Sequence, residues 1–211
     1  MKLSYQTYIF DLDGTLIDSS KDITEGVNHT LSKFNLPEKS DEEIMKHVGK
    51  GLKYLLKMVF PENTDENTIE KAYLIQKKFY ETKEIKAIPY QGTQKVIQIL
   101  KKYQKNIFLV TNKPQKATLK VLEKLNLTNY FNGIFGADAL IEHKPSPYPI
   151  NHIAKTYSLN KKQMVFIGDS KTDFETSKNA KTDFIWVTYG YESENLNTSK
   201  KADKITDILN F

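Results

Sequence analysis

Four short groups of polar residues have the types and spacing that chemistry on a phosphate or a metal requires. The first is DLDGT at residues 11–15, directly after the apolar run Tyr8–Phe10. Alternation along an extended chain sends the Asp11 and Asp13 side chains to the same side, and Gly14 permits a sharp turn after them. Carboxylates this close repel each other and resist burial without a cation. The pair therefore predicts a reactive or metal-binding site rather than an ordinary acidic turn.

The second and third groups supply hydrogen-bond donors and a cation. Thr111 and Asn112 follow the apolar run Asn106–Val110 and precede Pro114, a residue suited to the first turn of a helix. A hydroxyl and free N–H groups at the positive end of a helix dipole suit an anion. Lys144 precedes a proline, which restricts it to extended backbone. Each group alone is weak, because Thr-Asn before proline is a common cap and the chain has 31 lysines.

The fourth group is GDSKTD at residues 168–173, after the apolar run Met164–Ile167. Asp169 is expected at the strand tip and Asp173 one helical turn further on. Clustered carboxylate oxygens suit Mg²⁺, which takes few protein ligands. The ordinary alternative is a helix N-cap by Asp169 or Ser170.

The elements that must position these groups alternate between short strands and helices. Buried strands in this order predict an α/β fold with a parallel sheet covered by helices on both faces. The predicted strands are Tyr8–Phe10, Asn106–Val110, Met164–Ile167 and Phe184–Val187, with Asn132–Phe135 as a weaker fifth. The predicted helices are Thr93–Tyr103, Gln115–Leu125 with a stripe of Leu119, Leu122 and Leu125, and Ser146–Tyr157 with Ser146 as cap and Pro147 at the first position.

One segment breaks this alternation, since residues 19–86 read as helices without a convincing strand. A capping box at Ser40–Glu43 starts one helix. Leu52–Phe60 is a short apolar helix that Pro61 ends, and Asn63 or Thr64 is expected to cap the next. We expect a small helical domain, residues 18–86, inserted into a core of residues 1–17 and 87–211. Its two links to the core would act as hinges.

Composition excludes several kinds of chemistry. The 211 residues include no cysteine, so disulfides, thiolate nucleophiles and iron–sulfur clusters are ruled out. The net charge of +5 is spread among interleaved lysines and acids, which predicts no nucleic-acid partner. There is no membrane-length apolar run and no signal-peptide pattern, so we expect a cytoplasmic protein without a membrane partner. Because arginine is also absent, any anion must be bound by lysine, hydroxyls, backbone N–H groups or a metal.

Together the four groups occur in the order DxDGT, TN, KP and GDSxxD, each after a predicted strand. This combination resembles the haloacid dehalogenase-like hydrolase superfamily over nearly the whole chain. DLDGTLIDS at Asp11–Ser19, the helical segment after it, TNK at Thr111–Lys113 and KPSP at Lys144–Pro147 are similar to the phosphoglycolate phosphatase-type branch. The resemblance implies a Rossmann-like core, with the inserted helices as a cap domain.

The resemblance also implies a role for each residue. Asp11 would be the nucleophile that forms an aspartyl-phosphate, and Asp13 the general acid and then the general base. Lys144 would neutralise charge on Asp11 and on the transferring group. Asp173 would be a metal ligand or would orient one. The phosphoryl oxygens would be bound by Gly14, Thr15, Thr111, Asn112 and Lys144, and Mg²⁺ by Asp11, the carbonyl of Asp13, Asp169 and Asp173.

Two further stretches carry weaker expectations. Gly49-Lys50-Gly51 in the expected cap would allow close backbone approach to a substrate and offer a cation, although a loop with a surface lysine explains it equally well. Lys113 lies beside the site without an assigned role. The branch commonly has Ala-Gly where Asn179-Ala180-Lys181 stands here, so Lys181 lacks the easy left-handed cap of glycine.

The leading hypothesis is a Mg²⁺-dependent phosphatase acting on a small phosphorylated metabolite, as a monomer or homodimer. A phosphomutase of the β-phosphoglucomutase type, which passes the phosphoryl group to a sugar, is the enzymatic alternative. A 5′-nucleotidase or pyrophosphatase on the same scaffold is another. A basic binding protein on a retired phosphatase fold is disfavoured because no required residue is missing.

Overall fold

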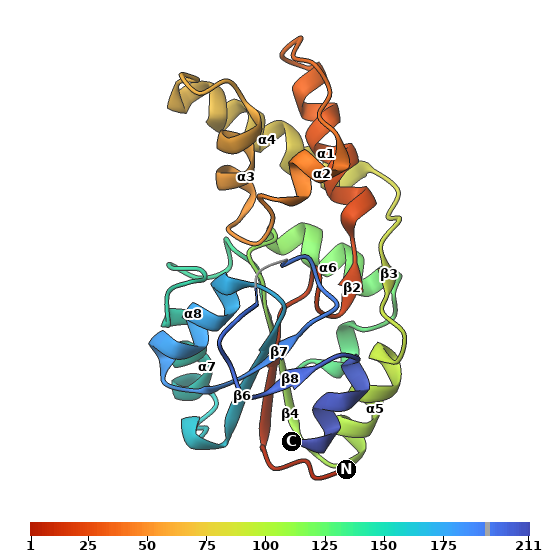
Figure 1. Ribbon diagram of the computed structural model, residues 1–211, viewed down its shortest axis with the longest axis vertical. Coiled ribbons are helices and arrows are strands. Elements are labelled where there is room, and N and C mark those ends of the chain that lie inside the picture. Colours follow the sequence, from red (N-terminus) through yellow and green to blue (C-terminus); the bar gives the residue numbers. More distant parts are fainter. Residues whose placement is uncertain (193–194) are drawn as a thin grey trace.

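The structure is a computed structural model that describes residues 1–192 and 195–211. A parallel sheet flanked by helices forms the larger part, and four helices form a separate group above one end of it (Figure 1). Both chain termini lie at the opposite end of the sheet (Figure 1). The predicted α/β, Rossmann-like fold class is thus confirmed. Among the described residues, no helix is long and apolar enough to cross a membrane.

The six strands lie in the order β5-β4-β1-β6-β7-β8, and every neighbouring pair is parallel. The central strand β1 pairs with β4 on one side and β6 on the other, so the polar groups that follow these three strands meet at one edge. The strands are β1 (Thr7–Phe10), β4 (Asn106–Val110), β5 (Gly133–Phe135), β6 (Met164–Gly168), β7 (Asp183–Val187) and β8 (Lys201–Ala202).

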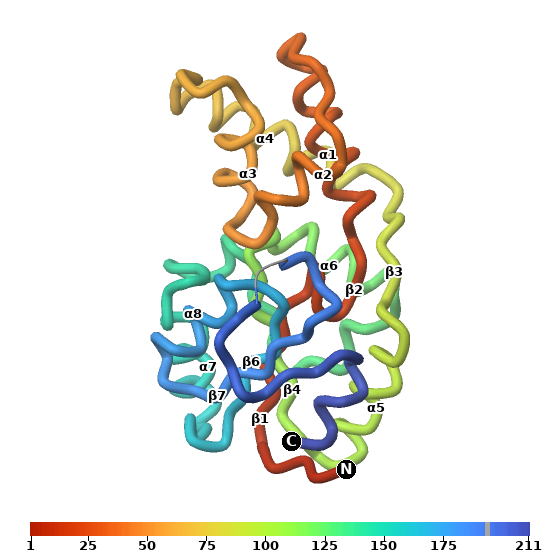
Figure 2. The backbone as a smooth tube through the Cα atoms, in the orientation of Figure 1, coloured from red at the N-terminus to blue at the C-terminus, as the bar shows by residue number. Residues whose placement is uncertain are grey.

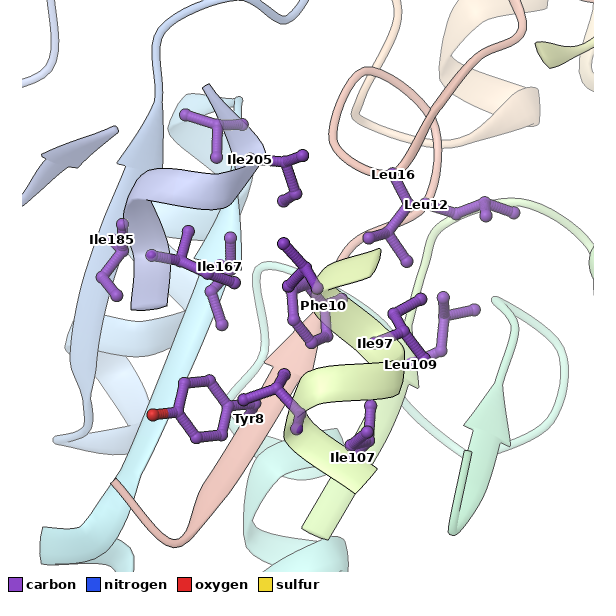
Figure 3. Close-up of a cluster of buried hydrophobic side chains, with 14 of the residues drawn as sticks. Tyr8, Phe10, Leu12, Leu16, Ile97, Ile107, Leu109, Ile167, Ile185 and Ile205 are labelled. Carbon is purple, nitrogen blue, oxygen red and sulfur yellow. The ribbon is translucent and has the colours of Figure 1, made fainter. Parts of the chain in front are cut away.

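Both faces of the sheet are covered, as the apolar strands require. Tyr8 and Phe10 of β1 pack on one face with Ile97 of α5 and Ile205 (Figure 3), while Ile9 packs on the other face with Ile150 of α7. The helices of this part are α5 (Thr93–Lys102), α6 (Gln115–Lys124), α7 (Tyr148–Thr156) and α8 (Lys171–Ala180), with 3₁₀ turns at Thr128–Tyr130, Lys161–Gln163 and Ile205–Asn210.

The separate group, which we call the helical insertion, leaves the core after β2 (Ile17–Asp18) and returns through β3 (Ile88–Pro89) (Figure 2). These two short strands pair antiparallel, so the outgoing and returning links lie together. The insertion has its own apolar cluster, which includes Val27, Ile44, Leu56 and Ile69. Its helices are α1 (Ser20–Ser32), α2 (Asp41–Met45), α3 (Leu52–Val59) and α4 (Glu66–Thr82).

Asp22 of α1 fastens the returning link. Its buried carboxylate accepts hydrogen bonds from the backbone N–H groups of Lys86 (2.9 Å) and Ala87 (3.0 Å). The Lys83 ammonium lies 2.8 Å from the same carboxylate. These bonds satisfy backbone donors just where the chain leaves α4, so the link has a defined path.

Several local predictions are confirmed and others are wrong. Ser40 forms the expected capping box with Glu43. The predicted cap at Asn63 or Thr64 is wrong. Thr64 is used in a turn in which its hydroxyl donates to the Pro61 carbonyl, and Asp65 caps α4 by accepting a bond from the Thr68 N–H (3.0 Å).

Two expectations for the core helices also need correction. Pro147 precedes α7 as its N-cap instead of occupying the first helical position, although the Ser146 hydroxyl does accept a bond from the Tyr148 N–H (3.1 Å). On α6 the expected apolar stripe is partly wrong, because the helix packs through Val121 and Leu122 and leaves Leu119 37% exposed.

Candidate active site

Three carboxylates meet at the carboxyl end of the sheet. Asp11 follows β1, Asp169 follows β6, and Asp173 lies in the first turn of α8. One carboxylate oxygen from each lies within 4.8 Å of the others, and all three residues are buried. We call this group the acidic cluster. The Asp13 side chain is not part of it.

Lys144 places a cation inside the acidic cluster. Its ammonium lies 2.8 Å from Asp11 and 2.6 Å from Asp173, and the side chain is 1% exposed. Although burial lowers the pKa of Lys144, attraction by the two carboxylates outweighs it and raises the pKa, so the side chain stays protonated. One ammonium facing three buried carboxylates leaves the cluster short of positive charge.

That deficit appears in the carboxyl groups themselves. Burial raises the pKa of Asp11 to about 7, with Lys144 opposing the shift and Asp173 adding to it. Burial also raises the pKa of Asp169 well above its usual value, assisted by repulsion from Asp173 and Asp11. Asp11 Oδ1 is buried and accepts no well-oriented hydrogen bond despite its ion pair with Lys144. Three clustered hard oxygen ligands with excess negative charge fit Mg²⁺.

The side chains of the acidic cluster are held in place by their neighbours. Asp169 accepts hydrogen bonds from the Thr15 hydroxyl (2.9 Å) and from the Tyr191 N–H (2.8 Å). A Cβ at Gly190 would lie 2.1 Å from the Asp169 Cβ, so only glycine lets this loop pack so closely. Asp173 accepts bonds from the N–H (3.0 Å) and hydroxyl (2.7 Å) of Ser170, which caps α8.

Asp13 lies beside the acidic cluster with partners of its own. The Lys113 ammonium lies 3.0 and 3.1 Å from its two carboxylate oxygens, and the Ser19 hydroxyl donates to it. Ser19 follows β2, where the chain leaves the core. The Tyr191 hydroxyl accepts a bond from the Ser19 N–H (2.7 Å), so the loop after β7 also touches this link.

A small cavity of about 60 Å³ lies between these groups and the helical insertion. Asn112 bridges the two sides, because its amide donates to the Gly49 carbonyl in the insertion (3.0 Å) and to the Lys144 carbonyl in the core (3.0 Å). The core side of the cavity is lined by Asp11, Asp13, Thr111, Asn112, Lys113 and Pro114, and the insertion side by Ile23, Val48, Gly49, Gly51, Leu52, Leu55 and Tyr80.

The residues predicted from the sequence divide between those at the cavity and those beside it. Gly49 and Gly51 line it, whereas Lys50 is exposed, with its ammonium 4.8 Å from the centre of the Tyr54 ring. Gly14 has φ +81° and packs against Asp169, and the Thr15 hydroxyl is engaged with the same carboxylate. The roles of these residues toward a substrate remain predictions.

Sequence reasoning missed the contacts of Ser19, Lys113 and Tyr191. Ser170 is the N-cap of α8, which confirms the N-cap alternative given for this group, and Ser-x-x-Asp at the start of a helix is a readable signal for a capping box. Tyr191 carried none, since it lies 22 residues from Asp169 along the chain. Lys181 adopts the left-handed conformation (φ +57°) expected of glycine at a helix end.

Comparison with known proteins agrees with this arrangement. Residues 8–187 match the family model of the haloacid dehalogenase-like hydrolases. The chain is 32% identical over 183 residues to the phosphoglycolate phosphatase of Aquifex aeolicus, covering 87% of this chain and 84% of that protein. It is 30% identical over 212 residues to the phosphoglycolate phosphatase of Neisseria gonorrhoeae, and the match covers 97% of this chain and 90% of that protein.

Solved structures show the same fold. The crystal structure of a predicted phosphoglycolate phosphatase from Haemophilus somnus superimposes with a TM-score of 0.89 at 25% identity, covering 98% of this chain and 97% of that one. The crystal structure of a predicted phosphatase from Clostridium acetobutylicum gives a TM-score of 0.85 at 26% identity, covering 98% of this chain and 99% of that one. The motifs, their meeting at one sheet edge and these matches lead to one conclusion. The chain belongs to the haloacid dehalogenase-like hydrolases, as an enzyme of the phosphoglycolate phosphatase-type branch.

Proposed function

We propose that the protein is a Mg²⁺-dependent phosphatase that hydrolyses a small phosphomonoester through an aspartyl-phosphate on Asp11. The observation that carries the proposal is the acidic cluster around Lys144, next to the N-terminal end of α6. Relatives named phosphoglycolate phosphatase make phosphoglycolate the first substrate to test.

In the first step, an oxygen of Asp11 attacks phosphorus and the bond from phosphorus to the ester oxygen breaks. The electron pair leaves with the alcohol, which takes a proton from Asp13. The Thr111 hydroxyl and the Asn112 N–H bind phosphoryl oxygens, and Gly14 and Thr15 shape the backbone around them. Lys144 opposes the rise that burial causes in the pKa of Asp11 and holds its carboxylate in place by an ion pair.

In the second step, Asp13 takes a proton from water, which attacks phosphorus. The bond from phosphorus to Asp11 breaks, and inorganic phosphate leaves. Mg²⁺ would be bound by Asp11, the carbonyl of Asp13 and Asp169, with Asp173 as a ligand or orienting residue, and would supply charge neutralisation for the transferring group. The three buried carboxylates, which lie within 4.8 Å of one another around a single ammonium, support this assignment.

We also propose that the helical insertion acts as a cap domain of residues 18–86 over a core of residues 1–17 and 87–211. Its links run side by side as β2 and β3, a geometry suited to a hinge. Gly49 and Gly51 bring its backbone to the cavity, where it would meet the leaving group. We place the enzyme in the cytoplasm, acting on a small metabolite as a monomer or homodimer, without a nucleic-acid or membrane partner.

Phosphate release from phosphoglycolate and p-nitrophenyl phosphate tests the proposal. Wild-type protein should release phosphate with Mg²⁺ and stop when a chelator is added, and Asp11→Asn should lose activity by roughly a thousandfold or more. Asp41→Asn, an exposed aspartate of α2, is the matched control and should keep it. Activity retained in Asp11→Asn would overturn the nucleophile assignment. Isomerisation of a sugar phosphate without phosphate release would instead identify a phosphomutase.

A further inference from the structure

The cavity next to Asp13 has apolar walls and one cation. The insertion side presents aliphatic groups from Ile23, Leu52 and Leu55. Among the described residues that line the cavity, Lys113 is the one basic side chain. The ammonium of Lys144 is instead occupied by Asp11 and Asp173. A leaving group that enters this space therefore meets one positive charge.

Lys113 is held rigidly, yet part of its binding capacity is unused. Its side chain is 5% exposed, and its ammonium lies 5.3 Å from the centre of the Tyr80 ring. Tyr80 is fixed in turn by a hydrogen bond from the Gln76 amide (2.8 Å). An ammonium has three N–H donors. Within the described part of the chain, Asp13 is the one hydrogen-bond partner of this ammonium, through its two oxygens.

We propose that Lys113 is a specificity-determining residue, whose remaining N–H donor binds an anionic group on the leaving alcohol. This inference rests on the proposed function and assigns a residue to the recognition of the leaving group. The alcohol oxygen must lie near the Asp13 carboxyl to receive its proton. The Lys113 ammonium lies 3.0 Å from an oxygen of that carboxyl. A carboxylate one carbon away from the ester oxygen is within reach of that donor.

Surroundings of this kind make such a contact selective. In a small, mostly apolar cavity a charge-assisted hydrogen bond is stronger than in water. A neutral leaving group cannot form this bond and leaves the remaining N–H donor of Lys113 buried and unpaired. Because the chain has no arginine, the contact is to a single ammonium rather than to a planar two-pronged donor.

Lys113 also positions Asp13, and the experiment must separate the two effects. Phosphoglycolate and ethyl phosphate differ at the leaving group, where a carboxylate replaces a methyl group. Loss of Asp13 positioning slows the hydrolysis of both substrates by the same factor. Loss of carboxylate recognition slows the hydrolysis of phosphoglycolate alone. The ratio of the two kcat/KM values therefore reports recognition.

In wild-type protein we expect this ratio to favour phosphoglycolate, and in Lys113→Met we expect it to fall by about ten- to a hundredfold. Lys102→Met, an exposed lysine of α5 in the core, is the control and should leave the ratio unchanged. An equal loss on both substrates, or an unchanged ratio, overturns the inference while leaving the phosphatase proposal intact. Phosphate release by wild-type protein from neither of these substrates nor from p-nitrophenyl phosphate overturns both.

A second measurement needs no variant, so it holds even if Lys113→Met does not fold. Glycolate should inhibit hydrolysis of ethyl phosphate competitively, because its carboxylate occupies the Lys113 donor, whereas ethanol at the same concentration should not. Equal inhibition, or none by either alcohol, contradicts a carboxylate contact at this position.

Discussion

The acidic cluster and the helical insertion face each other across one cavity, but they are built differently. In the cluster, Asp11 and Asp169 follow strands of one sheet and Asp173 lies in the first turn of α8, and buried ion pairs and hydrogen bonds hold these carboxylates. The insertion presents a glycine backbone and aliphatic side chains. Lys120 of α6 helps to hold it, donating to the carbonyls of Glu81 (2.9 Å) and Lys83 at the end of α4. The carboxylates and Lys113 thus belong to the core, and the insertion supplies the opposite wall of the cavity.

Removing the cation of the acidic cluster should have the largest effect on stability. Lys144→Met leaves Asp11 and Asp173 buried without their ion-pair partner, which costs about 3–5 kcal/mol. Urea unfolding measures this loss, and the double variant Lys144→Met, Asp173→Asn should recover part of it. Lys50→Met is a control in the insertion, where the side chain is exposed, and should unfold like wild type. Wild-type stability of Lys144→Met would show that the cluster does not depend on this charge.

Metal binding should couple to pH through the cluster. The folded pKa of Asp11, about 7, lies above that of an unfolded aspartate, so its protonation stabilises the metal-free protein below the unfolded pKa. That contribution is lost as pH rises through 7. Mg²⁺ requires the ionised form, so its stabilising effect should be larger at high pH.

Thermal unfolding with and without Mg²⁺, at pH 5.5 and pH 8, tests this coupling. The melting temperature of the metal-free protein should be lower at pH 8 than at pH 5.5. The increase in melting temperature caused by Mg²⁺ should be greater at pH 8. Asp11→Asn should weaken both trends. An increase with Mg²⁺ that is the same at both pH values would contradict a metal site that includes Asp11.

Loosening the insertion should alter substrate affinity without harming the core. Lys120→Met removes donors to the carboxyl-terminal carbonyls of α4, and we expect KM to rise by about three- to tenfold with a smaller change in kcat. Amide hydrogen exchange at the end of α4 should quicken. Lys116→Met is a matched control on the same helix, because its ammonium is 3.9 Å from Glu81 and its side chain is 74% exposed. Equal effects of the two variants would show that the hydrogen bonds of Lys120 do not hold the insertion in place.

The smallest effect is expected from a motif that occurs in both regions. Ser40 and Ser170 each form a capping box, but only Ser170 bonds to a residue of the acidic cluster. Ser40→Ala should cost about 1 kcal/mol of stability and no activity. Ser170→Ala should also lower kcat, because Asp173 loses a hydroxyl donor. Similar activity of the two variants would argue that Asp173 needs no support from Ser170.

How much was predictable from the sequence differs between the two regions. Strand ends and the residues that follow them are local in sequence, so Asp11, Thr111, Lys144 and Asp169 could be chosen as candidates. The meeting of the ends of β1, β4 and β6 at one edge follows from a parallel sheet. The cap of α4 was misplaced because Asn63, Thr64 and Asp65 are all residues that can cap a helix, and the choice depends on the turn after Pro61.

Long-range contacts carry no local signal. Asp22 of α1 binds the backbone of residues 86 and 87, and Lys113 lies 100 residues from Asp13 along the chain. Sequence pattern can mark such residues as polar, but only the packing of the insertion on the core brings their partners to them. The contacts between the insertion and the core were therefore less predictable than the meeting of the polar groups at the edge of the sheet.

Trapping the phosphorylated enzyme shows most directly whether Asp11 is the nucleophile. Protein mixed with phosphoglycolate and Mg²⁺ is quenched in acid during turnover, digested and mapped by mass spectrometry. We predict an acyl phosphate on Asp11 that forms before phosphate is released and is absent from Asp11→Asn. Phosphate release with no modified Asp11, or with the phosphoryl group on another residue, would contradict it.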